Sequence, residues 1–344
     1  LVVAEWGWHA GFGMAGIAML LGLIVYIGGQ KYLTEVGNKP TAETKKDDVS
    51  IGALYGKLLK SPLHLGIFIV LLALSIYAGF TFEGVDHWGY GALFIFLSFV
   101  VGMMMMVYKD LKTKIDKDRF VVLLLSFIIV IVFWGAFEQA GGLLNLYAAE
   151  KIDRVVFGWE MPASMTQFFN PLFIIVFGSI FSAMWIKLSK IGKNPSIPVK
   201  FGLAFFQIAL GFLVVKFMLP FADEAFQVPL ITLVLLYLLH TTGELFISPI
   251  GLSMVTKLAP KNVAGMAMGA WFLSWAMANY LGGVIASMTG GGHGAEGEAI
   301  QLTAQEGLMQ YTDIFSVLAY VLLGIGFIVI VLNKPIQKLM HGVE

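Results

Sequence analysis

Long apolar runs separated by short polar segments dominate the pattern of this chain. A helix needs about 20 mostly apolar residues to cross a bilayer, and nine stretches approach or exceed that length. The predicted spans are residues 8–29, 62–80, 89–108, 120–140, 166–187, 200–220, 229–254, 263–288 and 313–332. The pattern therefore predicts an all-α protein that crosses a membrane many times.

Lys and Arg concentrate in alternate segments between these spans. Basic segments follow the first, third, fifth, seventh and ninth spans, whereas residues 81–88, 221–227 and 289–310 hold neither Lys nor Arg. The segment after the fourth span holds Lys151 and Arg154. Because cytoplasmic segments carry an excess of Lys and Arg, we expect this chain to begin outside and end inside a cell (inner) membrane.

Composition agrees with a membrane protein and excludes several other classes. Of the 344 residues, 58% are hydrophobic and 13% are charged, against about 25% charged in soluble domains. The chain has no Cys and a net charge of zero, which argues against disulfides, thiolate metal sites and nucleic-acid binding. No nucleophile–base pair, phosphate loop or cofactor motif is visible, so the sequence predicts neither an enzyme nor a resident cofactor.

The polar segment after the first span suggests a boundary between parts of the protein. Residues 34–50 are polar and are predicted to form a mobile cytoplasmic linker. Residues 51–60 alternate apolar and basic character, which is typical of a helix at the membrane surface. The chain begins at Leu1 without a signal-peptide pattern, and we expect it to be a piece of a longer protein.

Glu244 lies in the middle of the span at 229–254. A carboxylate at mid-membrane depth costs about 2.5–3.5 kcal/mol on insertion scales, so it is retained where it faces protein or water. Ser248 lies one turn further on the same helix face, and Pro249 should free the carbonyl of Leu245 and kink the helix. A transport site is favoured, and a buried structural carboxylate paired with another helix is the alternative.

Glu138 ends the fourth span in the stretch FWGAFEQAGG. Trp134 precedes it by four residues and Phe137 by one, which places an aromatic wall beside a carboxylate. Such a pocket suits a solute that carries an amino group. An interfacial Glu with Trp134 as a membrane-belt residue is the equal alternative.

Three further side chains have two interpretations each. Asn170, followed by Pro171, could bind a ligand, and it could equally cap a helix whose first residue is Pro171. Trp271 could line a pocket, although packing is the simpler reading of a large aromatic residue in a span. His240 lies four residues before Glu244 and could tune its proton affinity, or could be a hydrogen-bonded core histidine.

Several stretches together resemble a known transporter family. GELFISPIGLSMVTKLAP and GMAMGAWFLSWAMANYLGG resemble the tenth and eleventh helices of the proton-dependent oligopeptide transporter family. GWHAGFGMAGIAMLLGLIVYIGGQKYL resembles its sixth helix, FWGAFEQAGG its seventh and FFNPLFIIVFG its eighth. The spans at 62–108 resemble the extra hairpin of its bacterial members. The resemblance covers essentially the whole chain.

The resemblance implies a fold and a division into parts. The fold is the C-terminal six-helix bundle of a major facilitator superfamily protein, with an extra two-helix hairpin and the last helix of the N-terminal bundle. The parts are that last helix at 1–30, a cytoplasmic linker with a surface helix at 31–60, the hairpin at 61–108 and the six-helix bundle at 109–344. The N-terminal half of the same transporter is then the expected partner.

The resemblance also implies roles. Bacterial members of the family are di- and tripeptide/proton symporters. Glu244 would meet the peptide amine and take part in proton coupling, with Ser248 and Pro249 at an inner gate. Asn170 would bind the peptide amine, and Glu138 would pair with an Arg of the N-terminal half near an outer gate. The residues implied as walls of the side-chain pocket are Trp134, Phe137 and Trp271.

The family's N-terminal signature and its N-half peptide-binding residues have no counterpart in this sequence. Two other functions therefore remain open beside proton-coupled peptide symport. One is a superfamily carrier for another small amino or anionic solute. The other is a half that binds a solute without transporting it. In the favoured interpretation no cofactor is expected, and the proton is the coupling ion.

Overall fold

The computed structural model describes residues 2–33, 104–260, 263–287 and 302–343, together with scattered positions between residues 52 and 77. The predicted linker at 34–50 lies outside the described residues, and so does most of the two spans predicted at 62–80 and 89–108. Residues 104–110, at the end of the second of these spans, are helical.

The other seven predicted spans fall on long helices. Their bounds are α1 (Val2–Leu33), α6 (Lys114–Phe137), α8 (Phe169–Lys190), α9 (Ile197–Phe217), α10 (Ile231–Leu258), α11 (Ala264–Ser287) and α12 (Ala304–Val331). Within the described residues, six of these helical regions are long and apolar enough to cross a membrane. The seventh, α11, is not among these six.

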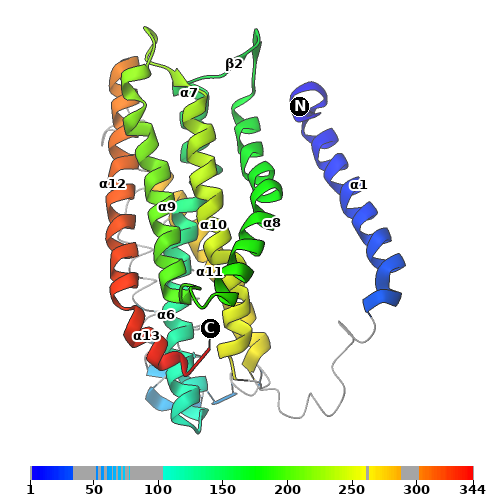
Figure 1. Ribbon diagram of the computed structural model, residues 1–344, viewed down its shortest axis with the longest axis vertical. Helices are drawn as coiled ribbons and strands as arrows, with labels where there is room; N and C mark the ends of the chain where they lie inside the picture. Colours follow the sequence, from blue (N-terminus) through cyan, green and yellow to red (C-terminus); the bar gives the residue numbers. More distant parts are fainter. Residues whose placement is uncertain are drawn as a thin grey trace.

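Helices α6 and α8–α12 form one bundle, in which α9 packs against α12 and α10, and α6 packs against α11 (Figure 1). Helices α9 and α12 approach most closely at glycines. A Cβ added at Gly326 of α12 would lie 2.9 Å from the carbonyl oxygen of Gly202 of α9. Helix α8 lies at the edge of the bundle against α10. Helix α1 stands apart on the α8 side, and none of its apolar span is buried (Figure 1).

Short elements link the helices at one end of the bundle. After α6 come the 3₁₀ helix η1 (Glu138–Ala140) and the short helix α7 (Leu143–Lys151). Strand β1 (Ile152–Asp153) pairs in parallel with β4 (Val228–Pro229), and β2 (Val155–Val156) pairs antiparallel with β3 (Trp159–Glu160). The 3₁₀ helices η2 (Ala163–Phe168) and η3 (Leu219–Phe221) precede α8 and follow α9.

The last span differs from its predicted bounds. Helix α12 begins at Ala304 and not near residue 313, because Thr303 and Glu306 form a capping box. The backbone N–H of Glu306 donates to Thr303 Oγ1 at 3.2 Å, and the backbone N–H of Thr303 donates to Glu306 Oε2 at 2.8 Å. After α12 comes a further short helix, α13 (Asn333–Met340), which the apolar pattern did not predict.

Candidate functional site

Glu244 lies near the middle of α10, and its side chain is partly buried. Asn170 Nδ2 donates a hydrogen bond to Glu244 Oε2 at 3.0 Å. Among the described residues no Lys, Arg or His forms an ion pair with this carboxylate. The acid is therefore held by a neutral amide, and its charge is left without a compensating cation from the described part of the chain.

Asn170 connects α8 to α10 through two bonds. Its Nδ2 also donates to Thr241 Oγ1 at 3.0 Å, so each hydrogen of the amide can serve one acceptor on α10. Thr241 and Glu244 are three residues apart and share a helix face. The reading of Asn170 as a cap is wrong, because η2 runs directly into α8. The capping position is Phe168, and no side chain caps this end.

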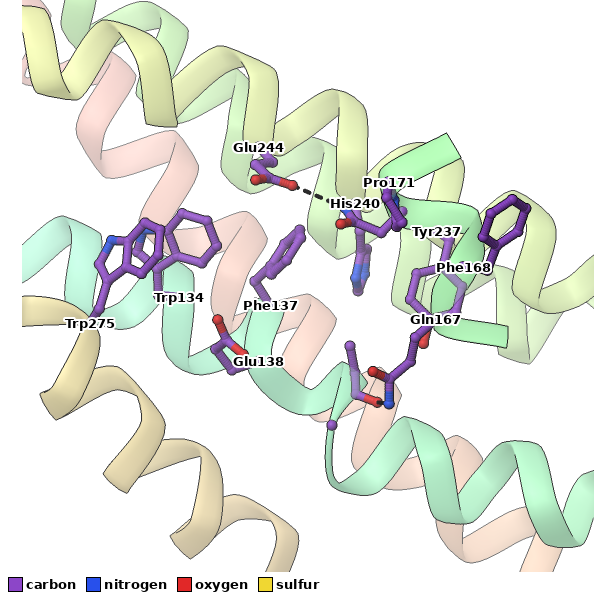
Figure 2. Close-up of a pocket in the computed structure, with 13 residues that line it drawn as sticks. Trp134, Phe137, Glu138, Gln167, Phe168, Pro171, Tyr237, His240, Glu244 and Trp275 are labelled. Atoms are coloured by element: carbon purple, nitrogen blue, oxygen red, sulfur yellow. Dashed lines mark hydrogen bonds between the residues drawn. The ribbon is translucent and has the colours of Figure 1, made fainter. Parts of the chain in front are cut away.

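A cavity of about 590 Å³ opens beside this pair (Figure 2). Residues of α6, η1, η2, α8, α10 and α11 line it, and they are Trp134, Phe137, Glu138, Ala140, Gly141, Gln167, Phe168, Asn170, Pro171, Tyr237, His240, Glu244 and Trp275. In the view of Figure 2, Glu244 and Glu138 lie on either side of the Phe137 ring. A volume of this size is in the range of small-molecule sites.

Two indole rings form one wall of the cavity. The ring centroids of Trp134 and Trp275 are 4.3 Å apart, and those of Trp134 and Phe137 are 5.0 Å apart with an angle of 74° between the planes. Both indole Nε1 atoms are buried without an acceptor among the described residues. This wall offers a broad apolar surface to the cavity.

Trp271, predicted to wall the pocket, lies elsewhere. It is 1% exposed, and a Cβ added at Gly251 of α10 would overlap its ring. Trp275, one turn further along α11, lines the cavity instead. Ser248 and Pro249 also lie outside the residues that line this cavity, and α10 continues as a helix through Pro249.

Glu138 is the first residue of η1, where α6 gives way to a tighter turn. The neighbouring Gln139 is buried, and its Nε2 donates to Gly135 O at 2.8 Å and to Gly282 O of α11 at 3.2 Å. This anchor fixes the end of α6 against α11 and directs Glu138 to the cavity. The geometry thus favours a pocket carboxylate over an interfacial one. No described Lys, Arg or His pairs with Glu138.

His240 is a buried, hydrogen-bonded histidine that touches the cavity. Its Nε2 lies 3.2 Å from the carbonyl oxygen of Ile208, so Nε2 carries the hydrogen and donates it. Its ring packs edge-on against Phe212, with centroids 4.7 Å apart. No hydrogen bond joins it to Glu244 in the described part of the chain, and the geometry favours the structural reading.

Sequence reasoning did not assign Thr241, Trp275, Gln167 and Tyr237 to the site. Thr241 lies on the helix face of Glu244, so its spacing could have indicated it, and Trp275 lies one turn from Trp271. Gln167 donates through Nε2 to Ala140 O at 3.0 Å and joins η2 to η1. Tyr237 lines the cavity from α10. Nothing in the local sequence of these last two residues indicates their place.

Metal binding is not indicated here. Within the described residues no group of three or more His, Cys, Asp or Glu side chains is arranged to hold a metal ion. The described groups that the cavity offers are two carboxylates, the amides of Asn170 and Gln167, and aromatic side chains.

Similar proteins point to a transporter. The chain is 30% identical to the "Uncharacterized transporter YclF" of Bacillus subtilis over 98% of this chain and 63% of that protein. It is also 30% identical to the "Peptide transporter YePEPT" of Yersinia enterocolitica, over 98% of this chain and 64% of that protein. This chain thus spans just under two thirds of the length of these relatives.

Solved structures agree with the sequence relatives. A peptide transporter POT in complex with sulfate matches with a TM-score of 0.64 and 28% identity, over 99% of this chain and 64% of that one. The sequence model of the POT family matches residues 1–302. With its apolar helices, the protein is a multi-pass membrane protein of the major facilitator type, and the chain belongs to the POT family of transporters.

Proposed function

We propose that this chain is the C-terminal part of a proton-coupled symporter that carries di- and tripeptides into the cell by alternating access. Family membership supports the proposal, together with the names of relatives such as "Dipeptide and tripeptide permease B" of Xenorhabdus bovienii, which is 29% identical over 84% of this chain. The observation that carries it is the Glu244 carboxylate, which faces a cavity and has no described cation beside it.

A membrane-embedded carboxylate without a cation needs a positive charge from elsewhere, because an isolated charge is costly there. A proton can supply it, and so can the free amine of a peptide. Only Oε2 is held by Asn170, which leaves the other oxygen for either. Because the two compete for the same group, the arriving amine displaces a proton that Glu244 has taken up from the outer side. We propose that the displaced proton leaves to the inner side, so that proton and peptide cross the membrane in the same direction.

The rest of the cavity suits the remainder of a short peptide. The indoles of Trp134 and Trp275 and the ring of Phe137 can receive an apolar side chain. Glu138 is a second carboxylate in the same cavity. We propose that an Arg of the N-terminal half pairs with it at the outer gate.

Transport also requires the other half of the protein. Superfamily carriers bind substrate between two halves that rock about the site, so the N-terminal half of the same transporter and the lipid bilayer are the proposed partners. The alternation of basic and non-basic segments supports a cell inner membrane location, with residue 1 outside and the C-terminus in the cytoplasm. In that orientation η1 and η2 lie on the outer side.

A carrier for another small amino solute is the second candidate. A POT family transporter solved in complex with 5-aminolevulinic acid matches this chain with a TM-score of 0.65 and 27% identity. That ligand carries an amine and a carboxylate, as a peptide does. The Glu244–Asn170 pair would bind the amine in both cases. Other residues would determine which solute length is accepted.

The experiment is uptake of a labelled dipeptide by the intact transporter in proteoliposomes under an inward proton gradient. We expect uptake that unlabelled di- and tripeptides abolish and an N-acetylated dipeptide does not, because acetylation removes the charged amine. Equal competition by 5-aminolevulinate and failure of tripeptides would favour the second candidate. Labelled dipeptide that binds without entering the lumen would favour a non-transporting half and contradict symport.

A further inference from the structure

Lys200 is a buried cation near the start of α9. Its residue is 6% exposed, and within the described residues no carboxylate lies within ion-pair distance of its ammonium group. Among the described residues, the one interaction found for its Nζ atom is with the face of Trp185, 4.5 Å from the ring centroid. A cation–π contact offsets only part of the cost of burying an ion.

The surroundings add positive charge instead of compensating it. Lys200 lies in the first turns of α9, and the N-terminus of a helix carries partial positive charge. Lys257, near the end of α10, repels it further. The side chain of Lys200 is therefore in a strongly positive region that the described residues do not neutralise.

A second cavity, of about 450 Å³, lies beside Lys200 between α8, α9 and α10. Trp185 lines this cavity, and its indole Nε1 is buried and has no acceptor among the described residues. The hydroxyls of Ser182 and Ser253 and the amide of Asn194 belong to its lining. Ammonium, indole N–H, hydroxyl and amide groups together form a set of donors that calls for an anionic acceptor with several oxygens.

The remaining wall of the cavity is apolar. Phe181 on α8 and Leu245 and Ile250 on α10 line it, and the adjoining outer face of α8 exposes Ile180 and Ile186 at 54% and 55%. The cavity thus has a polar, cationic end near the α8–α9 turn and an apolar side that adjoins exposed apolar side chains of α8. A free inorganic anion would use only the first of these features.

We propose that this cavity binds a phosphate group carried by an anionic phospholipid, with the phosphate at Lys200 and Trp185 and the start of an acyl chain along the apolar wall. The lining shares no residue with the cavity at Glu244. Asn170 and Trp185 are fifteen positions apart on α8, which corresponds to about 22 Å along the helix. The lipid would therefore contact α8 and α10 away from the Glu244–Asn170 pair, towards the opposite end of each helix.

The test measures lipid binding to the intact, delipidated transporter by native mass spectrometry and by thermal unfolding. The probes are phosphatidylglycerol, phosphatidylcholine and inorganic phosphate. We expect phosphatidylglycerol to bind Lys200→Gln at least about tenfold more weakly than the unaltered protein, because the variant lacks the charge-assisted contact to the phosphate. Lys200→Arg should keep most of the binding, and phosphatidylcholine should bind weakly to all variants.

Two further variants make the result decisive. Lys187→Gln removes an exposed lysine from the same end of α8 and should leave binding unchanged. Trp185→Phe keeps an aromatic ring beside Lys200 but removes the N–H donor, and it should weaken binding even if Lys200→Gln fails to fold. Equal losses in Lys187→Gln and Lys200→Gln, or no loss in either Lys200→Gln or Trp185→Phe, would overturn the proposal. Stabilisation by inorganic phosphate equal to that by phosphatidylglycerol would reject the lipid as ligand.

Discussion

Helices α8 and α9 follow one another in the chain, have 22 and 21 residues and are similarly apolar, yet their surroundings are opposite. Within this chain more than half of α9 is buried, and none of α8 is. Small residues make the difference, because Gly202, Ala204 and Gly211 let α9 approach its neighbours closely. Apolar content alone predicts that both helices cross the membrane, but not which one forms the core.

What holds α8 to the bundle is a small set of specific contacts with α10. Asn170 bonds Thr241 and Glu244 at one end, and Trp185 packs edge-on against Phe246 at the other, with centroids 4.9 Å apart. A helix attached in this way can shift without disturbing the core. This suits a transporter, in which the site must change shape while the rest of the bundle stays fixed. Substitutions in α9–α12 and α8–α10 contacts should therefore have different effects.

The largest expected effect is on the α9–α12 contact. Gly326→Leu inserts a side chain where even a Cβ would lie 2.9 Å from a backbone oxygen and 3.0 Å from Phe205. Overpacking costs about 1–3 kcal/mol and occasionally more, and here backbone must move. We expect loss of monodisperse protein or a large fall in unfolding temperature. Gly324→Leu, at a position with nothing within 4 Å, is the matched control. Equal behaviour of the two variants would contradict the close packing.

A smaller effect is expected where α8 meets α10. Asn170→Ala removes both bonds to α10, and a hydrogen bond to a charged group contributes about 1.5–3 kcal/mol. Hydrogen exchange in the first half of α8 should rise, with little change in α9. The control is Asn279→Ala, because Asn279 is exposed and bonds Trp275 O of its own helix. Faster exchange in α9 as well would show that the two helices are not independent.

The smallest effect is expected for one of the two bonds of Asn170. Thr241→Val removes the hydroxyl acceptor and leaves Glu244 in place, so we expect a loss of about 1 kcal/mol in thermal unfolding. Thr242→Val is a close control, since its hydroxyl bonds only Leu238 and Leu239 of its own helix. Indistinguishable unfolding of the two variants would mean that the bond to Thr241 adds nothing.

Much of this architecture could be predicted from the sequence. Every predicted span that falls in a fully described region is a helix, because the apolar runs are long and bounded by charge. The start of α12 was missed although Thr303 and Glu306 carry a visible capping-box signature. The extent of α13 depends partly on contacts far away in sequence, such as Arg119 Nε donating to Met340 O at 3.3 Å.

The sequence indicated those site residues that are rare in apolar spans. It could not indicate which of two residues on one helix face reaches the cavity, because packing against the neighbouring helix decides this. Glu244 and Glu138 stand out as carboxylates in apolar runs, and both line the cavity. Trp271 and Trp275 share a helix face, so their spacing cannot tell which is buried under the neighbouring helix. Gly251, on α10, makes room for Trp271 and leaves Trp275 at the cavity.

The central claim is that Glu244 exchanges a proton for the amine of the substrate. The most direct measurement compares proton-driven uptake with counterflow exchange of a labelled dipeptide in proteoliposomes, for the intact transporter and for Glu244→Gln. Glu160→Gln, an exposed carboxylate paired with Arg154 outside the cavity, serves as control. We expect Glu244→Gln to abolish driven uptake and to retain some counterflow, with the control unchanged. Driven uptake by Glu244→Gln equal to that of the unaltered protein would contradict the account.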